Sequence, residues 1–434
     1  MPLCSTKNRS LRHPWSEGVL KGLAPDGGLY MPVQLPTVSR QQLESLRGAP
    51  FTELAFHIAH AFLENEVPED LLKEICSAAF NFDAPLKEIA PNTHILELFH
   101  GPTCAFKDFG ARFMARLFRH FLGRDAEPLT VLVATSGDTG SAVANAFFDD
   151  TPLPAIQVSI LFPKGKVTPV QEKQMTTLGH NVTAFEVEGT FDDCQAIVKR
   201  ALLDHAVTGK KRLTSANSIN IARLLPQIFY YVYAVLQLPP NTKPIISVPS
   251  GNLGNLTGGL IAHQLGATVE RFIAACNRNA PFPTYLRSGL FAPHPSYETI
   301  SNAMDVGNPS NFARILPLFN DEISAIRDRI TGETVSDEET RAEIRRCFQE
   351  TGYVVCPHTA VGLVAANRYA LRATHTNPHI ILATAHPAKF AKTVEPEIGR
   401  NVEYPRQLTE AMNQESKKVS ITNSYQEFVR HLLA

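Results

Sequence analysis

Two segments of this chain share one local pattern, and the pattern limits the folds open to it. Leu129–Asn145 and Pro244–His263 each begin with a β-branched apolar run, continue into a loop rich in Gly, Ser, Asp or Asn, and end in a helical pattern. Such units are typical of α/β proteins, in which helices cover a largely parallel sheet. Ligands of these folds bind beyond the carboxyl ends of the strands, so the repeat predicts two α/β halves that face one cleft.

Other stretches of the chain extend the α/β interpretation. A long helix is expected over Ile219–Leu238, where Pro226 predicts either a kink or a later start. Phe106, Phe109 and Phe113 recur at helical spacing and predict a second helix with an aromatic core stripe. Six short apolar runs predict strands: Leu129–Ala134, Ile156–Phe162, Val182–Val187, Pro244–Val248, Arg271–Ala275 and His379–Ala383.

The ends of the chain lack these units. Residues 1–90 contain the turn Ala24–Gly28 and then a stretch, Ser39–Phe80, that is mostly helical in pattern. The polar segment 396–434 carries no site motif. We therefore predict a mainly helical N-terminal region (1–90), a catalytic region of two three-layer α/β subdomains (91–395) and a C-terminal tail (396–434).

Composition narrows the class of protein. A chain of 434 residues, 44% of them hydrophobic, is long enough for roughly two to three domains or subdomains. Its 41 Lys and Arg balance 42 Asp and Glu, which argues against a general nucleic-acid or membrane-surface binder. No apolar run approaches the roughly 20 residues of a membrane-spanning helix, and the first residues lack the apolar core of a secretory signal. Seven scattered cysteines without a CxxC pair favour a reducing, cytoplasmic location.

The two glycine-containing loops are candidate anion sites. Gly251 and Gly254 let the backbone approach a ligand where a helix begins, and free amides at a helix N-terminus bind phosphate. An ordinary tight turn capped by Asn explains this loop equally well. The other loop follows the predicted strand Leu129–Ala134. Its Ser136 and Thr139 hydroxyls can bind a second anion, or they can simply cap the following helix.

A third candidate is Lys107, which lies among apolar residues in the segment His100–Phe109. A lysine with a lowered pKa in such a pocket can form a Schiff base. Spacing alone favours a surface lysine paired with Asp108. Cys104 is expected to be a small buried apolar side chain. His100, His358 and His386 have no metal-ligand spacing, so no metal is expected, although His386 could line the cleft.

Seen together, these segments form an ordered series: HGPTCAFKDFG, ATSGDTGSA, LFPKGK with QEKQMTTLG, EGTFDDCQA, SANSINIARLLPQI, VPSGNLGNLTGGL and ATAHPAKF. The series, which spans about residues 18–395, resembles the threonine synthase family in its bacterial and fungal long form. The resemblance implies a pyridoxal-phosphate enzyme of the tryptophan-synthase-β fold type (fold type II). It also implies conversion of O-phospho-L-homoserine and water to L-threonine and phosphate.

The resemblance assigns roles to residues at matching positions. Lys107 matches the lysine that holds the cofactor as a Schiff base, and Thr384 matches the hydroxyl that faces the pyridine nitrogen. Asp138 matches a position near the cofactor ring or its 3′ oxygen. The other implied cofactor residues are Phe106 and the phosphate loop Ser250, Gly251, Asn252, Leu253, Gly254 and Asn255. The implied substrate residues are Ser136, Thr139, Asn217, Ser218 and Arg223.

Two departures and two alternatives remain. Leu253 stands where the family typically has Phe and Asn255 where Asp is common, but neither change removes a backbone amide. The alternative reaction is that of another pyridoxal-phosphate lyase, which eliminates ammonia from serine, threonine or phosphohomoserine and forms a keto acid. A non-catalytic relative is the alternative class, but it should have lost Lys107 or the glycine loop. The resemblance implies a monomer or weak homo-oligomer.

Overall fold

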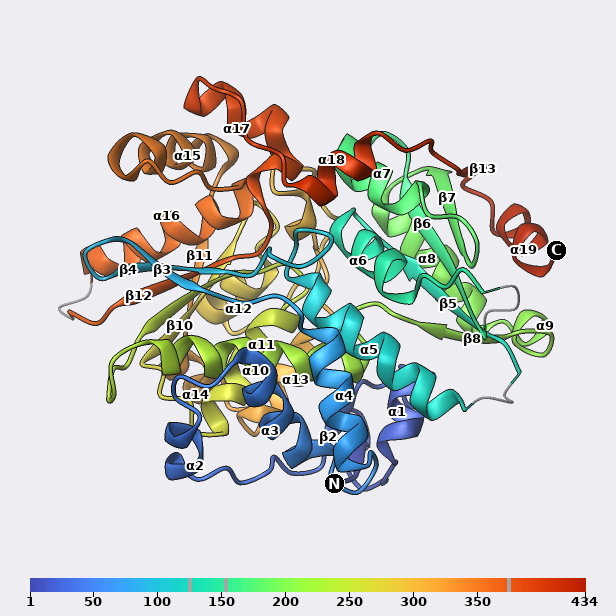
Figure 1. Cartoon of the computed structure of the whole chain (residues 1–434), viewed down its shortest axis with the longest axis horizontal. Helices are drawn as coiled ribbons and strands as arrows, with labels where there is room; N and C mark the ends of the chain where they lie inside the picture. The colour runs from blue at the N-terminus through green and yellow to red at the C-terminus, as the bar shows by residue number, and fades with distance from the viewer. Residues whose placement is uncertain (124–126, 152–154, 373–375) are drawn as a thin grey trace.

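Two separate β-sheets, each covered by helices on both faces, organise the computed structural model (Figure 1). The structure describes residues 1–123, 127–151, 155–372 and 376–434. The architecture confirms the predicted α/β class with largely parallel sheets.

The first sheet has six strands in the order β11-β10-β9-β12-β4-β3, parallel except for the antiparallel pair β3–β4. Successive residues of β9 face opposite sides: Ile246 and Val248 pack toward α10 and α11, and Ile245 packs toward α15 and α16. The elements are β3 (Leu86–Ala90), β4 (Thr93–Glu97), β9 (Ile245–Pro249), β10 (Arg271–Cys276), β11 (Ile330–Thr334), β12 (His379–Ala383), α10 (Ile221–Gln237), α11 (Gly254–Gln264), α15 (Asp337–Thr351) and α16 (Pro357–Arg372).

The second sheet has five parallel strands in the order β13-β7-β6-β5-β8. Val131 and Val133 of β5 pack with α5 and α6, whereas Leu132 and Ala134 pack with α8 and α19. The elements are β5 (Leu129–Ala134), β6 (Ile156–Pro163), β7 (Val182–Glu188), β8 (Arg212–Ser215), β13 (Val419–Thr422), α5 (Lys107–Leu122), α6 (Asp138–Phe147), α8 (Phe191–Leu203) and α19 (Tyr425–Leu433).

The N-terminal region lies beneath both sheets in Figure 1, with α3 against α10 and α4 against α5. It is mainly helical, as predicted, but it also contains a short antiparallel pair, β1–β2, that the sequence did not suggest. Its elements are β1 (Leu3–Ser5), α1 (Trp15–Lys21), β2 (Tyr30–Pro32), α2 (Arg40–Ser45), α3 (Phe51–Leu63) and α4 (Glu69–Ala79).

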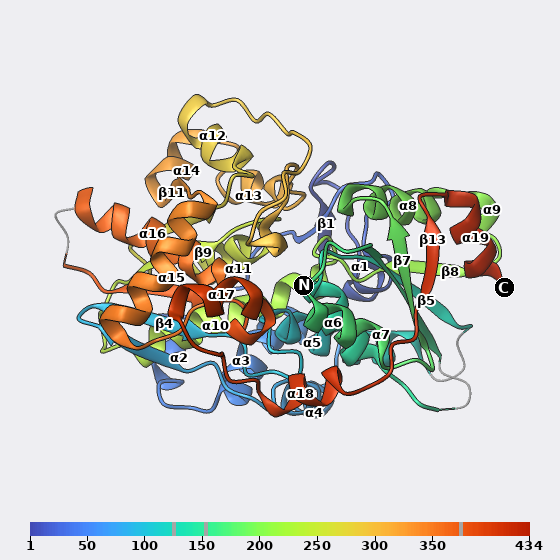
Figure 2. The same ribbon diagram turned by 90° about the horizontal axis from the view of Figure 1, so that it is seen from above.

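The C-terminal segment is integrated into the fold. After α17 and α18 it crosses from the six-stranded to the five-stranded sheet, where β13 adds an outer strand beside β7 (Figure 2). The predicted division at residues 90 and 395 stays a prediction. The remaining helices are α7 (Pro169–Thr176), α9 (His205–Thr208), α12 (Pro281–Ser288), η1 (Asn302–Met304), α13 (Phe312–Leu318), α14 (Ile323–Arg329), η2 (Pro387–Phe390), α17 (Ala391–Ile398) and α18 (Arg406–Met412).

The predicted long helix begins two residues late, at Ile221. Asn220 caps it, because the Asn220 Oδ1 atom accepts a hydrogen bond from the Ala222 amide at 2.9 Å. Pro226 still lies inside the helix, so this later start does not account for the proline, and the kink stays a prediction. All six predicted strands are present within one residue at either end. No helix in the described part of the chain combines the length and apolar character that crossing a bilayer requires.

Candidate active site

A cavity of about 1200 Å³ lies where the loops that follow β5 and β9 meet the start of α5. The segment after β12 and the residues around the start of α10 add to its wall, as do parts of the N-terminal region, α8 and the stretch 296–321. Thirteen of the fifteen predicted site residues line it: Phe106, Lys107, Ser136, Asp138, Thr139, Asn217, Ser218, Arg223, Gly251, Asn252, Gly254, Asn255 and Thr384. Ser250 and Leu253 are the two exceptions.

Lys107 is the first residue of α5, and its half-buried side chain lines the cavity. Its Nζ atom lies 4.3 Å from the centre of the Phe106 ring. Burial lowers the pKa of Lys107 to about 8, and the nearby Arg223 charge acts in the same direction. The alternative of a surface lysine paired with Asp108 is wrong, because Asp108 is itself buried and accepts hydrogen bonds from the amide and hydroxyl of Thr103. Lys107 is therefore available as a partly neutral, nucleophilic amine.

Phe106 corrects one sequence expectation. Phe109 and Phe113 are fully buried on α5 as predicted, but Phe106 precedes the helix and lines the cavity. The Phe106 amide donates to the Thr384 carbonyl at 2.9 Å, which holds the segments that carry Lys107 and Thr384 together. Thr384 follows β12 directly, so the end of that strand delivers its hydroxyl to the cavity.

The loop between β9 and α11 exposes backbone to the cavity. Leu253 has a left-handed φ of 60° and turns its side chain into the core, while the Ser250 hydroxyl donates to the Val248 carbonyl at 2.7 Å. Neither side chain therefore reaches the cavity. A Cβ atom on Gly251 would lie 2.9 Å from the Met304 Cα atom, so glycine is required there by close approach. The first amides of α11 have no carbonyl one turn earlier to bond, which leaves them for an anion.

Neutral side chains hold this loop. Asn252 donates to the Ser218 hydroxyl at 2.5 Å, and its backbone carbonyl accepts from Asn311 at 3.0 Å. Asn255 Oδ1 accepts from the hydroxyls of Tyr230 and Tyr231 at 2.6 and 2.8 Å. The loop is thus fixed from behind without a charged partner among these contacts.

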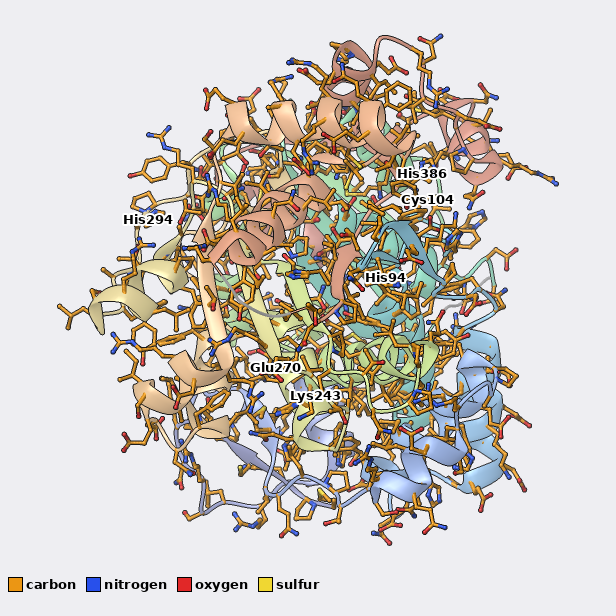
Figure 3. The ribbon with its side chains drawn as sticks, turned by 90° about the vertical axis from the view of Figure 1, so that its left-hand side faces the viewer. His94, Cys104, Lys243, Glu270, His294 and His386 are labelled. Atoms are coloured by element: carbon orange, nitrogen blue, oxygen red, sulfur yellow. The ribbon has the colours of Figure 1, made fainter. Side chains whose placement is uncertain are left out.

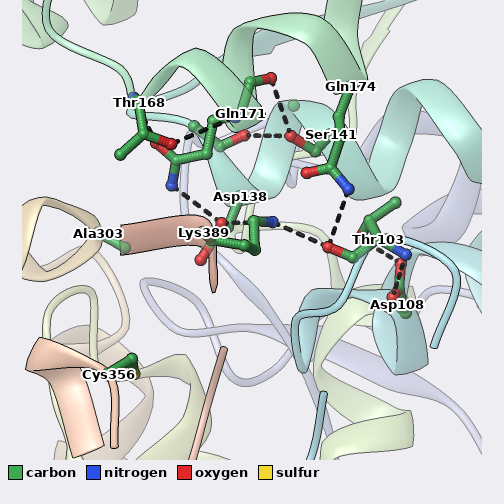
Figure 4. A network of polar contacts seen from close by, with 12 residues as sticks. Thr103, Asp108, Asp138, Ser141, Thr168, Gln171, Gln174, Ala303, Cys356 and Lys389 are labelled. Carbon is green, nitrogen blue, oxygen red and sulfur yellow. Dashed lines mark hydrogen bonds and ion pairs between the residues drawn. The ribbon is translucent and has the colours of Figure 1, made fainter. Parts of the chain in front are cut away.

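The loop between β5 and α6 presents a carboxylate. The Thr135 hydroxyl accepts from the amides of Gly137 and Gly140, both at 2.9 Å. The buried Asp138 Oδ1 lies 2.8 Å from Lys389 Nζ and accepts from Gln171 Nε2 at 2.9 Å (Figure 4). Burial by itself would raise the pKa of Asp138, but the Lys389 ammonium holds it below its ordinary value. Asp138 is therefore ionised at neutral pH.

Arg223 supplies a positive charge to the cavity wall from the first turn of α10. Burial lowers its pKa to about 10, so the guanidinium stays charged at neutral pH. Its Nη1 atom donates to the Ala216 carbonyl at 2.7 Å. Asn217 beside it is fixed by the end of β5, where its Nδ2 atom donates to the Ala134 carbonyl at 2.7 Å. These contacts leave a fixed guanidinium and amide facing the cavity, a pair suited to an anionic substrate group.

Histidine positions differ from expectation. His358 lines the cavity, where its Nε2 atom accepts from the Ala303 amide at 3.2 Å and burial lowers its pKa to about 4. His386 lies instead against Cys104 (Figure 3), whose carbonyl accepts from the His386 amide at 3.0 Å. Cys104 is a buried thiol packed with apolar side chains, as predicted. Among the described residues, no three His, Cys, Asp or Glu side chains gather as metal ligands would.

Sequence reasoning missed His358, Gln171 and Lys389. Each is buried and comes from a segment far along the chain from Lys107. Lys389 had one available signal, because a lysine within the apolar run Pro387–Phe390 is out of place on a surface.

The residues present fit pyridoxal phosphate. Lys107 offers an amine for its aldehyde, and the α11 amides offer a cradle for its phosphate. Arg223 Nε and Asn255 Nδ2 are buried donors without a hydrogen-bond partner in the described structure. Buried donors left unpaired are costly, so these two atoms favour an occupant that accepts hydrogen bonds.

Comparison with known families agrees with this chemistry. The family described as "Pyridoxal-phosphate dependent enzyme" matches residues 94–384. "Threonine synthase N terminus" matches residues 3–80, and "Threonine synthase, C-terminal" matches residues 359–432.

Individual proteins are similar over nearly the whole chain. Threonine synthase of Escherichia coli (strain K12) is 42% identical over 415 residues, covering 94% of each chain. The crystal structure of threonine synthase from Escherichia coli superposes with a TM-score of 0.93 at 40% identity, over 100% of this chain and 99% of that one. A structure of PLP-bound threonine synthase from Brucella melitensis superposes with a TM-score of 0.91 at 34% identity, over 99% of both chains.

Proposed function

Because this chain belongs to the threonine synthase family of pyridoxal-phosphate-dependent enzymes, we propose that its substrate is O-phospho-L-homoserine, which it converts with water to L-threonine and phosphate. The observation that carries the proposal is the half-buried Lys107 amine, whose pKa is lowered to about 8 and which shares one cavity with the open start of α11 and with Arg223.

Pyridoxal phosphate, when bound, supplies a conjugated ring that accepts electrons as protons leave the substrate's Cα and then Cβ, before phosphate leaves Cγ. Lys107 moves these protons. Its pKa of about 8 lies close to neutral pH, so the amine can both accept and return a proton, as a general base and acid must.

The remaining cavity residues orient the reacting groups. Gly254, Asn255 and Thr384 line the cavity. The amides of Gly254 and Asn255 would hold the cofactor phosphate, and the Thr384 hydroxyl would face the pyridine nitrogen. Asp138 supplies a fixed negative charge near the ring. A neutral hydroxyl at Thr384, in place of a carboxylate, would leave the pyridine nitrogen of the bound cofactor largely unprotonated and so temper electron withdrawal by the ring.

The substrate's two anionic groups require separate sites. Arg223 binds the phosphate through paired, charge-assisted hydrogen bonds, assisted by Asn217 and Ser218. Ser136 and Thr139, beside the start of α6, bind the carboxylate. Fixing both ends of a short substrate places its Cα and Cβ against Lys107.

The test incubates cofactor-loaded protein with O-phospho-L-homoserine and measures phosphate and threonine together. Equal amounts of the two products are expected from the wild-type protein and from Lys166→Ala, which changes an exposed lysine paired with Glu298. Lys107→Ala should release neither product. Phosphate released with ammonia and a keto acid would identify the alternative lyase reaction. No phosphate release despite bound cofactor would contradict the proposed substrate.

Two accompanying expectations also remain proposals. All seven cysteines are buried free thiols, which favours a reducing compartment such as the cytoplasm. A monomer or weak homo-oligomer is proposed from the family resemblance, and light scattering at two concentrations tests it.

A further inference from the structure

One buried cation outside the predicted site contacts two segments of the active site. Lys389 lies in η2, five residues after Thr384, and its ammonium is fully buried. Figure 4 shows its Nζ atom between the Asp138 carboxylate, at 2.8 Å, and the Thr103 carbonyl, at 2.9 Å. Thr103 lies in the loop that leads into Lys107, so one ammonium connects the segments that carry Thr384, Asp138 and Lys107.

Each partner of Lys389 is itself constrained. The Thr103 carbonyl also accepts from Gln174 Nε2 at 3.1 Å, and the Thr103 hydroxyl donates to Asp108 at 2.6 Å. The Asp138 carboxylate also accepts from Gln171. These contacts leave the Asp138 carboxylate little freedom to rotate. Among the residues of this network, Lys389 supplies the positive charge.

The ion pair joins the two halves of the cleft. Asp138 begins α6, which packs on the five-stranded sheet, whereas Lys389 follows β12 of the six-stranded sheet. A buried charge that loses its partner is strongly unfavourable, because neither water nor another ion replaces the lost contact. The pair is thus one of the contacts that fix the spacing of the two halves, beside the hydrogen bond from the Phe106 amide to the Thr384 carbonyl.

This spacing matters for the chemistry. Lys107 and Asp138 begin α5 and α6, which both pack on the five-stranded sheet, whereas Thr384 follows β12 of the six-stranded sheet. The Phe106 amide ties Thr384 to the start of α5. Lys389 ties the segment after Thr384 to Asp138. We propose that Lys389 is a positioning residue, which sets the place and charge of Asp138 relative to Lys107 and Thr384 around the bound cofactor. The inference rests on the proposed function for its activity readout only.

The test compares Lys389→Met with Lys392→Met in the cofactor-loaded protein. Lys392 lies three residues further along the same segment and is exposed, so it is a matched control. We expect Lys389→Met to lower kcat by about a hundredfold and KM for O-phospho-L-homoserine by less than about threefold, the pattern of misplaced reacting groups. The absorption band of bound pyridoxal phosphate should also shift, because the charge facing the ring is no longer held in place. Lys392→Met should match the wild-type protein in both.

The outcomes separate the two proposals. An absorption band and a kcat equal to those of the wild-type protein in Lys389→Met would overturn the positioning role. If the wild-type protein fails to act on O-phospho-L-homoserine, the proposed substrate is wrong, and the absorption band and cofactor affinity of the variants still decide the role of Lys389.

If Lys389→Met does not fold, Lys389→Arg tests the positioning role of Lys389 instead. Its guanidinium keeps the positive charge, but a longer planar group cannot reproduce the contacts with Asp138 and Thr103 together. We expect kcat to fall at least about fivefold, with a displaced absorption band. A folded Lys389→Arg protein with the wild-type kcat and band would overturn the proposal.

Discussion

The loops before α6 and α11 look alike in the sequence and differ in what they offer a ligand. In the α6 loop, the Thr135 hydroxyl takes two of the backbone donors, and the loop presents the charged Asp138. In the α11 loop, neutral partners hold Asn252 and Asn255 from behind, and the first helical amides stay open. The comparison shows that a strand–loop–helix pattern locates the edge of the sheet at which a ligand binds. The hydrogen bonds inside each loop decide whether that loop presents a negative charge or free backbone donors to the ligand.

The largest expected effect concerns Lys107, which faces both loops. Burial lowers its pKa from an ordinary 10.5 to about 8, so between these pH values the unfolded apoprotein binds more protons than the folded one. The free energy of unfolding should therefore rise with pH across this window, by up to about 3 kcal/mol from this group. Below pH 8 both states are protonated, and the full cost of burying the charge remains.

Urea unfolding of wild-type and Lys107→Met apoprotein measures this contribution. The stability advantage of Lys107→Met should be greatest below pH 8 and shrink toward pH 10.5. Lys166→Met, at an exposed position, should follow the wild-type pH dependence. A pH dependence unchanged by Lys107→Met would show that the cavity leaves the lysine fully charged.

Gly137→Ala should disturb the loop before α6, which presents the charged Asp138. Gly137 has a φ of 134°, and an added Cβ would lie 2.3 Å from the Gln171 carboxamide carbon, displacing a partner of Asp138. We expect kcat to fall about a hundredfold, with cofactor affinity nearly unchanged. Gly165→Ala is the control, because its φ is also positive, at 70°, but nothing lies within 4 Å. If Gly137→Ala and Gly165→Ala lowered kcat equally, backbone strain alone would explain the loss of activity.

Gly251→Ala tests the loop before α11, whose first helical amides are free to bind a ligand. Its Cβ would press on the Met304 Cα atom, and backbone cannot move aside as a flexible side chain can. We expect the Kd for pyridoxal phosphate to rise about tenfold, with kcat at saturating cofactor much less affected. Fluorescence titration of the apoprotein measures the Kd. If Gly251→Ala instead lowered kcat and left the Kd unchanged, the contrast between the two loops would be lost.

The smallest expected effect is a loss of stability when one hydrogen bond that holds the loop before α11 is removed. Tyr231→Phe removes one of two hydroxyls that donate to Asn255, and Tyr230 still occupies the same oxygen. The free energy of unfolding should fall by about 1 kcal/mol, the contribution of one neutral hydrogen bond. Chemical unfolding of the holoenzyme measures it. No loss at all would mean that Tyr230 alone holds the loop.

The strand predictions were accurate where strands are central and apolar, and incomplete at the edges. β5, β6, β9 and β12 are buried on both faces, so they appear as continuous apolar runs. The strands of these sheets that were not predicted are β3, β4, β8, β11 and β13. All but β4 lie at a sheet edge, and the polar or partly exposed residues in each of the five weaken the apolar signal.

The site predictions divide in a similar way. Glycine loops and a lysine in an apolar segment are local signals, and they located Lys107 and both loops. Ser250 and Leu253 were placed at the loop correctly, but their side chains turn to a carbonyl and to the core for reasons that depend on φ and on packing. Lys389 joins Asp138 and Thr103 only through the fold, because these three residues lie far apart in the chain.

The sequence by itself determined the α/β class, the ordered family motifs and the residues that face one cleft, since periodicity and turn chemistry act over short stretches of chain. Only the tertiary structure decided which donors remain open, how far the pKa of Lys107 falls and which cation holds Asp138. Those properties depend on burial and on contacts between distant segments, and the distance between two charges exists only after the two sheets have packed around the cavity.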